Sequence, residues 1–342
     1  MQPRAFITGL SGPELNAAER AFIGAERPWG FILFKRNIDT PQRVASLVDE
    51  LKECTGRADV PVLIDQEGGR VQRLGPPYWP AYPAGALFGR LYDIDPALGL
   101  SAARLSARLI AADLWELGVN VDCLPLADVP VAGADAVIGD RAYGTEPGKV
   151  AAIARAVTEG LEQGGILPVL KHIPGHGRAT ADTHLRLPTV ATPKNELERT
   201  DFAAFQPLAD LPMAMTAHVV FSALDPVHPA TTSATIIQQV IRGAIGFQGL
   251  LMSDDVSMNA LSGSIAERTR AIISAGCDVV LHCNGKLDEM REVAAETPEL
   301  SGKALERAGK ALASRRTPQP FARAAAWAEL EAMMGKAGTS DV

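Results

Sequence analysis

Three of the six histidines in the chain lie in one short segment, KHIPGHGRATADTH, which runs from Lys171 to His184. Two glycines and a proline interrupt this segment, so it is too broken to form a helix, and it is too polar for a core. Histidines and an aspartate in such a loop fit three kinds of chemistry: metal binding, phosphate binding and general acid/base catalysis.

A metal site is one interpretation. His172, His176 and His184 would supply imidazoles, and Asp182 or Asp254 would complete the coordination. The histidines are four and eight residues apart on an expected loop, however, and not on one face of an HExxH helix. A phosphate loop fits less well still, because GHGRAT lacks the Gly-Lys-Ser/Thr ending and no GxGxxG motif opens a helix elsewhere. We therefore expect neither a metal nor a cofactor.

General acid/base catalysis would use the end of the segment. Asp182 and His184 are separated by one residue, so a kinked loop could bring the carboxylate to the Nδ1–H of the imidazole. That contact would fix the tautomer and leave Nε2 free to exchange a proton with a substrate. A histidine has an unperturbed pKa of about 6.5, so it needs less tuning for this task than a carboxylic acid. The alternative is a capping aspartate next to an unrelated histidine.

A complementary group lies in SDDVSM, residues 253–258. An aspartate at the end of a strand, held by neighbouring donors, can stay ionised and attack an electrophilic carbon. Asp254 and Asp255 would point to opposite sides of a continuing strand, so we expect only one of them to face a cavity. Asp255 can cap the following segment, which leaves Asp254 for chemistry.

Two further motifs offer groups that bind oxygen-rich ligands. In IDQEGGRVQRL, residues 64–74, Asp65 can accept two adjacent sugar hydroxyls and Arg73 can hold another oxygen. The paired glycines of this motif would let the backbone approach a ligand closely. VIGDRAYG, residues 137–144, adds Arg141. In both motifs an Asp–Arg ion pair is the alternative.

These groups need a scaffold that brings them together, and the chain alternates short apolar runs with longer helical patterns. The apolar runs are continuous, which is typical of parallel strands buried on both faces. Eight such strands with helices between them predict a single (β/α)8 barrel of the α/β class, with the polar candidates at its active, carboxyl-terminal face. A doubly wound open sheet is the alternative. The expected strands are 4–10, 30–38, 60–68, 119–129, 166–175, 213–221, 249–258 and 277–283.

The helical segments have start signals and extend beyond the last strand. Thr40 can cap a helix that begins at Pro41. After about residue 300 the sequence is rich in alanine and helical, with prolines separating two segments. We expect one catalytic domain of residues 1–342, with the barrel in about 1–300, C-terminal helices in about 300–337 and a tail at 338–342. The helices expected between strands are 40–54, 101–118, 146–165, 195–210, 232–246 and 264–276.

Composition narrows the class of protein. Of 342 residues, 47% are hydrophobic and 21% charged, and the formal net charge is −7. The acidic balance disfavours nucleic acid or an anionic membrane surface as a partner, and no apolar stretch reaches the length of a membrane span. The four cysteines form no CxxC pair and fit reduced thiols. We therefore expect a cytoplasmic protein, and a monomer.

Taken together, the motifs resemble glycoside hydrolase family 3, specifically its bacterial β-N-acetylhexosaminidase branch. The resemblance rests on KHxPGHGxxxxDxH, which is highly specific, on IDQEGGRVQR and on SDD, and it extends to roughly Leu300. Similar family members use a single (β/α)8 barrel and no metal to remove a terminal nonreducing β-linked N-acetylglucosamine, with retention and through a glycosyl-enzyme intermediate. Cytoplasmic Gram-negative members act on muropeptides that carry 1,6-anhydro-N-acetylmuramic acid during cell-wall recycling.

This resemblance implies a role for each candidate residue. Asp254 would be the nucleophile and His184 the acid/base, with Asp182 as its dyad partner. A β-glucosidase of the same family, a metal-dependent hydrolase and a noncatalytic sugar-binding barrel stay open, as does a mechanism in which the substrate's acetamide is the nucleophile. The implied sugar-binding residues are Asp65, Arg73, Arg141, Lys171 and His172.

Overall fold

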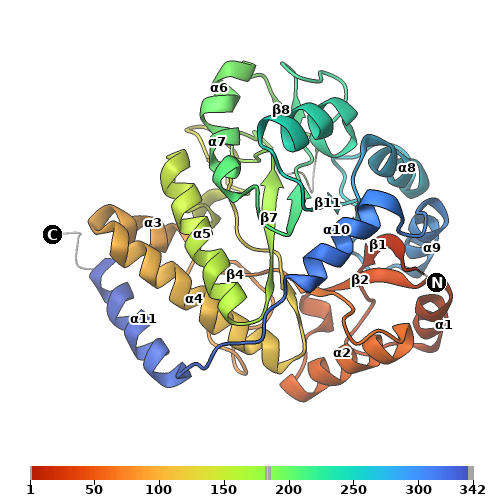
Figure 1. The fold of residues 1–342 in the computed structure, drawn as a ribbon, viewed down its shortest axis with the longest axis horizontal. Coiled ribbons are helices and arrows are strands. Elements are labelled where there is room, and N and C mark those ends of the chain that lie inside the picture. Colours follow the sequence, from red (N-terminus) through yellow and green to blue (C-terminus); the bar gives the residue numbers. More distant parts are fainter. Residues whose placement is uncertain (1, 182, 184–185, 338–342) are drawn as a thin grey trace.

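The chain folds into a closed barrel of eight parallel strands surrounded by helices (Figure 1). The computed structural model describes residues 2–181, 183 and 186–337, so Asp182 and His184 lie outside the described residues. Neighbouring barrel strands follow the order β1-β12-β11-β9-β7-β6-β3-β2, which closes on itself and excludes the open sheet. The barrel strands are β1 Arg4–Thr8, β2 Pro28–Leu33, β3 Val62–Ile64, β6 Val121–Asp122, β7 Leu167–Ile173, β9 Met213–Thr216, β11 Leu250–Asp255 and β12 Val279–His282.

All eight expected strands are present, and each lies within the residues predicted for it or begins at most two residues before them. The prediction of a (β/α)8 barrel is confirmed. The reason is burial on two sides: one set of strand side chains fills the barrel, and the other packs against the helices. In β7, for example, all seven residues are buried.

The helices form the outer layer, and most begin with the signals read from the sequence. The side chain of Thr40 accepts a hydrogen bond from the backbone N–H of Arg43, and Pro41 is the first residue of α2, as predicted. The helices are α1 Ala17–Glu26, α2 Pro41–Thr55, α3 Gly85–Ile94, α4 Pro96–Glu116, α5 Pro147–Gln163, α6 Lys194–Arg199, α7 Asp201–Phe205, α8 Ile265–Ala275, α9 Leu287–Glu296, α10 Gly302–Ala313 and α11 Arg323–Ala337.

Three local features differ from the expected pattern. The segment Ile236–Ala244, labelled η5, is a π-helix rather than an ordinary α-helix. The helices α1, α3 and α9 were not predicted. The motif after β3 is not a plain loop: β4 (Gln66–Gly68) and β5 (Val71–Gln72) pair antiparallel as a short hairpin.

The two expected C-terminal helices are present, and α10 closes the barrel on the side away from the candidate site. Its Ala308 and Ala311 belong to the apolar cluster inside the barrel. Arg307 of α10 pairs with Asp278, which directly precedes β12, so the helix lies at the amino-terminal end of the strands. The chain then returns along the outside, where α11 packs on α3 and α4 (Figure 1). The expected tail at 338–342 lies outside the described residues.

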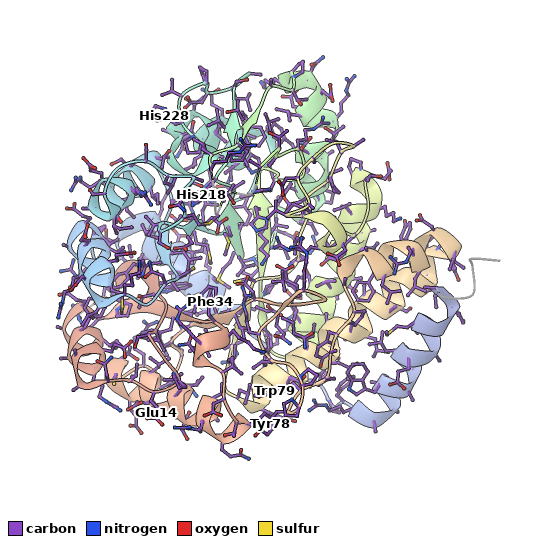
Figure 2. The ribbon with its side chains drawn as sticks, turned by 180° about the vertical axis from the view of Figure 1, so that it is seen from behind. Glu14, Phe34, Tyr78, Trp79, His218 and His228 are labelled. Carbon is purple, nitrogen blue, oxygen red and sulfur yellow. The ribbon has the colours of Figure 1, made fainter. Side chains whose placement is uncertain are left out.

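Minor elements complete the fold. A second two-stranded sheet pairs β8 (Thr189–Val190) with β10 (Val220–Phe221), and four short 3-10 turns are η1 Lys35–Asn37, η2 Gly139–Arg141, η3 Gln206–Leu208 and η4 Ala230–Thr232. Phe34 and His218 lie toward the middle of the molecule in Figure 2, whereas Glu14, Tyr78 and His228 lie toward its edge. None of the helices in the described ranges combines the length and apolarity that crossing a bilayer requires.

Candidate active site

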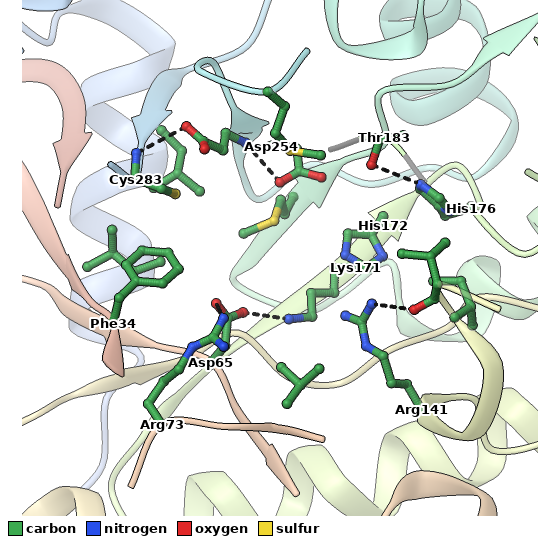
Figure 3. Close-up of a pocket in the computed structure, with 18 of the residues that line it drawn as sticks. Phe34, Asp65, Arg73, Arg141, Lys171, His172, His176, Thr183, Asp254 and Cys283 are labelled. Carbon is green, nitrogen blue, oxygen red and sulfur yellow. Dashed lines mark hydrogen bonds and ion pairs between the residues drawn. The ribbon is translucent and has the colours of Figure 1, made fainter. Parts of the chain in front are cut away.

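A cavity opens at the carboxyl ends of the barrel strands, and six of the eight predicted site residues line it (Figure 3). Its volume of about 280 Å³ lies near the lower limit of typical small-molecule sites, roughly 300–1,000 Å³. Asp254 lies on one side of it, and Asp65, Lys171 and Arg141 lie on the other. The six residues are Asp65, Arg73, Arg141, Lys171, His172 and Asp254.

Lys171 is the centre of a buried network of charges. It is 1% exposed, and its Nζ lies 2.8 Å from Oδ1 of Asp65 and 2.7 Å from Oε1 of Glu67. Arg141 binds both carboxylate oxygens of Glu67, through Nε at 2.8 Å and Nη2 at 2.7 Å. Arg73 binds the other oxygen of Asp65 at 2.9 Å. Three cations therefore surround two carboxylates, which leaves a positive excess on this wall.

The charges in this network stabilise each other. Burial alone would raise the pKa of Asp65 and Glu67. Lys171, together with Arg73 at Asp65 and with Arg141 at Glu67, outweighs burial, and both pKa values fall below their ordinary range. Burial alone would lower the pKa of Lys171, yet the two carboxylates raise it above its ordinary value. All three groups are thus ionised at neutral pH. A ligand in the cavity meets fixed charges that need little reorganisation.

For each of the two motifs that contain Arg73 and Arg141, an Asp–Arg ion pair was the alternative interpretation of the sequence. The pair of Asp65 with Arg73 does form, but it lies in the cavity wall and not on the open surface. Arg141 does not pair with its neighbour Asp140, because Asp140 binds Arg70 instead. The partner of Arg141 is Glu67, which sequence reasoning did not assign, although it stands two residues after Asp65 in the same motif.

The paired glycines of this motif allow a close approach of another chain segment. Gly68 and Gly69 have φ angles of 92° and 57°, which only glycine adopts readily. A Cβ on Gly68 would lie 2.2 Å from the carbonyl oxygen of Pro83, and one on Gly69 would lie 2.7 Å from Cβ of Ala84. The glycines therefore let the β4–β5 hairpin turn tightly against the segment that precedes α3.

His172 forms a buried pair with an aspartate from the preceding strand connection. Its Nδ1 lies 2.7 Å from Oδ2 of Asp128, which is 0% exposed. Oδ1 of Asp128 accepts the backbone N–H groups of His172 and His176, at 3.3 and 2.7 Å. Burial would raise the pKa of Asp128, but His172 and His176 together outweigh it and the pKa falls to about 2. The carboxylate therefore keeps a proton on Nδ1 and leaves Nε2 of His172 for the cavity.

His176 lies beside this pair and lines the cavity too. Its ring centroid is 5.6 Å from that of His172, and its Nε2 is 3.4 Å from the hydroxyl of Thr183. Burial, together with His172, lowers the pKa of His176 to about 4, so the ring is neutral at physiological pH.

Asp254 stands at the end of β11 with its carboxylate at the cavity. Its Oδ1 accepts the backbone N–H of Asp255 at 2.8 Å. Burial would raise the pKa of Asp254, but His218 and His172 outweigh burial and lower it. The side chain is therefore an ionised carboxylate, as a nucleophile or an electrostatic stabiliser would need.

Asp255 also lines the cavity, so the expectation that only one of the two aspartates faces it is wrong. A register shift between β11 and β12 falls at this point, and the regular alternation of the strand ends there. The carboxylate of Asp255 accepts three hydrogen bonds, from the backbone N–H and hydroxyl of Ser257 at 3.0 and 2.6 Å and from the backbone N–H of Cys283 at 3.1 Å. These bonds occupy it and leave Asp254 as the more available carboxylate.

The remaining two predicted site residues, Asp182 and His184, lie outside the described residues. Across residues 2–181, 183 and 186–337, no three His, Cys, Asp or Glu side chains are grouped so as to hold a metal ion. The cavity wall also contains apolar side chains that sequence reasoning did not name. Phe34 is one, and the guanidinium groups of Arg36 and Arg73 each lie 5.0 Å from its ring centre. It lies within the second expected strand, 30–38, and directly follows β2 in the structure.

The barrel with a charged cavity at the carboxyl ends of its strands has the architecture of an enzyme, and the family comparison identifies its class as sugar-cleaving. The chain belongs to glycosyl hydrolase family 3, because the model of that family's N-terminal domain matches residues 6–312. The predicted family is confirmed.

Three similar proteins match most of this chain over most of their own length. A protein named β-hexosaminidase from Alkalilimnicola ehrlichii is 39% identical over 282 residues, which cover 81% of this chain and 80% of the relative. A second protein named β-hexosaminidase, from Xanthomonas campestris, is 36% identical over 297 residues, which cover 85% of this chain and 88% of the relative. NagZ from Neisseria gonorrhoeae, solved in complex with N-trifluoroacetyl-D-glucosamine, has a TM-score of 0.85 at 30% identity over 98% of both chains.

Proposed function

We propose that residues 1–342 form one catalytic domain that removes terminal nonreducing β-linked N-acetylglucosamine. The enzyme class, a β-N-acetylhexosaminidase, accords with the names of the relatives. One observation supports the chemistry most directly: an ionised Asp254 faces a cavity whose opposite wall is built from the Asp65–Lys171–Arg141 network. In this proposal a sugar ring lies between the two walls.

The wall opposite Asp254 binds the sugar hydroxyls. Asp65 accepts hydrogen bonds from hydroxyl groups, and Lys171, Arg73 and Arg141 donate to hydroxyl oxygens. His172, fixed by Asp128, presents Nε2 to the ring. The positive excess of the wall also offsets the charge of Asp254 before it reacts.

The reaction then follows a retaining course. Asp254 attacks the anomeric carbon while His184, oriented by Asp182, protonates the departing glycosidic oxygen. The bond from the anomeric carbon to that oxygen breaks, and a glycosyl ester forms on Asp254. His184 next takes a proton from water, which attacks the same carbon and releases the sugar and a free Asp254. A histidine acid avoids placing another carboxylate beside the nucleophile, which would disfavour ionisation of Asp254.

The proposed natural substrate is a muropeptide with a 1,6-anhydro-N-acetylmuramic acid aglycone, cleaved in the cytoplasm by a monomer during peptidoglycan recycling. Two features support a short substrate. The cavity is small, and the family match and the barrel account for nearly the whole chain, as they do for NagZ of N. gonorrhoeae.

The direct test compares release of a chromophore from an aryl β-N-acetylglucosaminide and from an aryl β-glucoside, each with and without a chelator. We expect turnover of the N-acetylglucosaminide that the chelator does not change. Faster turnover of the glucoside would identify a β-glucosidase, and loss of activity with chelator would identify a metal-dependent hydrolase. Binding of N-acetylglucosamine without turnover of either substrate would identify a noncatalytic sugar-binding barrel.

A further inference from the structure

His218 lies directly behind Asp254 and takes no part in the cavity wall. It follows β9 and is 0% exposed, as are Thr216 and Thr231 beside it. Both of its ring nitrogens have partners: Nδ1 lies 2.8 Å from the hydroxyl of Thr231, and Nε2 lies 2.9 Å from the backbone carbonyl oxygen of Asp255. A buried histidine with two such contacts is fixed in position and orientation.

The contact between Nδ1 of His218 and Thr231 continues through two hydroxyl groups to the nucleophile. The hydroxyls of Thr231 and Thr216 lie 2.8 Å apart, and that of Thr216 accepts the backbone N–H of Asp254 at 3.3 Å. Together with the Nε2 contact, these bonds form a closed ring. The ring runs from His218 to the carbonyl of Asp255, along the backbone to the N–H of Asp254, and back through the two threonines.

The number of available protons gives this ring a direction. A carbonyl oxygen only accepts, so Nε2 of His218 carries a proton and donates it to Asp255. The backbone N–H of Asp254 only donates, so Thr216 accepts there and has its own proton for Thr231. Thr231 accepts that proton and has one of its own, which it can share between Nδ1 of His218 at 2.8 Å and the carbonyl oxygen of Ala217 at 3.0 Å. Every member of the ring is therefore satisfied, and a change at any one leaves a buried polar group unpaired.

We propose that His218 is a positioning residue for Asp254, acting through Thr231 and Thr216 on one side and the Asp255 carbonyl on the other. The ring holds the backbone on both sides of the nucleophile, so it sets the direction in which the carboxylate points into the cavity. The Asp65–Lys171 network does not perform this task, because its described contacts do not reach the β11 backbone, whereas the ring holds the residue, Asp255, whose N–H binds Oδ1 of Asp254. The inference rests on the proposed role of Asp254 as nucleophile.

Two matched pairs of variants test the ring. Thr231→Val removes the hydroxyl with little change in shape, and Thr231→Ser keeps it. His218→Asn places an amide near Nδ1 that does not reach Asp255, whereas His218→Gln reaches the Nε2 position. The assay is the rate of glycosyl-enzyme formation with an activated fluorinated N-acetylglucosaminyl substrate, and the inhibition constant of N-acetylglucosamine is measured alongside it.

We expect Thr231→Val and His218→Asn to slow glycosyl-enzyme formation by roughly 10- to 100-fold, the range associated with misplaced reacting groups. For these two variants the inhibition constant of N-acetylglucosamine should stay within about twofold of the parent value, because the sugar-binding wall is untouched. The control variants Thr231→Ser and His218→Gln should retain most of the parent rate. Parent-like rates in Thr231→Val and His218→Asn would overturn the proposal. Equal losses of rate and sugar affinity would do so too, because they would indicate a general structural role.

The double variant Thr231→Val/His218→Asn adds an internal check: members of one ring should not lose rate additively, so additive losses also count against the ring. If Thr231→Val does not fold, Thr216→Val with Thr216→Ser as its control tests the next member. Failure of the proposed function has a separate signature. In that case Asp254→Asn would retain turnover in the parent background, whatever the threonine variants do.

Discussion

Replacing Asp128 by asparagine would test how the site holds His172. The change keeps the shape of the side chain and one oxygen, which can still accept the two backbone N–H groups of His172 and His176. The new amide NH2 takes the place of Oδ2, which now lies 2.7 Å from Nδ1 of His172. Two donors would face each other there, so we expect Nδ1 to give up its proton. The cavity-facing Nε2 would then become a donor.

The size of the effect follows from the pKa of Asp128. Burial alone would raise it, but His172 and His176 together bring it from 3.8 to about 2. At about 1.4 kcal/mol per pKa unit, this shift corresponds to about 2 kcal/mol of stability. A carboxyl group whose pKa is lower in the folded than in the unfolded protein stabilises the fold fully when the pH is above its unfolded-state pKa. This stabilisation is lost as the pH falls through its folded-state pKa. The contribution is therefore complete at neutral pH and about half as large near pH 3.

Chemical unfolding of the parent protein and of Asp128→Asn, each at pH 7 and near pH 3, measures the difference in their free energies of unfolding. We expect the free energy of unfolding of Asp128→Asn to fall by about 2 kcal/mol at pH 7 and by clearly less near pH 3. We also expect this variant to bind N-acetylglucosamine roughly tenfold more weakly, which is the effect of one misdirected hydrogen bond. Asp140→Asn is the control, because Asp140 forms an exposed ion pair with Arg70, and such pairs contribute about 0–1 kcal/mol. If Asp128→Asn is as stable as Asp140→Asn and binds the sugar as tightly, the Asp128–His172 pair neither stabilises the fold nor orients His172 for binding.

Three further substitutions probe the proposed roles. Asp254→Ala should nearly abolish turnover, measured with an aryl N-acetylglucosaminide, while its thermal unfolding midpoint stays close to the parent's. His184→Ala should be least harmful with leaving groups that need no proton, and equal damage for good and poor leaving groups would show that it is not the acid. Lys171→Met should destabilise the fold by about 3–5 kcal/mol in unfolding experiments, because it leaves Asp65 and Glu67 buried with one fewer cation. A Lys171→Met protein of parent-like stability would refute that reasoning.

The strands were predictable from the sequence because each is buried on both sides and therefore appears as one continuous apolar run. Asp65, Lys171, His172 and Asp254 were found for a related reason. Each polar residue follows or ends such a run, and a barrel places all these ends on one face. Arg73 and Arg141 were found through their motifs, within a few residues of other polar groups.

What sequence reasoning missed depends on contacts between distant parts of the chain. Asp128 binds His172 across 44 positions, and Glu67 binds Arg141 across 74. No local pattern marks such pairs. The positive φ angles of Gly68 and Gly69 were consistent with a glycine motif, but only the structure shows that the neighbouring chain segment, rather than a ligand, requires them. The register shift that turns Asp255 toward the cavity is likewise set by the pairing of β11 with β12.

The central claim is that Asp254 forms a covalent bond with the sugar, and one measurement tests it most directly. The protein is incubated with a fluorinated N-acetylglucosaminyl substrate that forms the glycosyl-enzyme faster than it is hydrolysed, then digested and examined by mass spectrometry. We predict one added sugar on the peptide that contains SDDVSM, with fragmentation placing it on Asp254. A sugar on another residue, or turnover of the reagent with no labelled peptide at any time, would contradict the account and favour the acetamide of the substrate as the nucleophile.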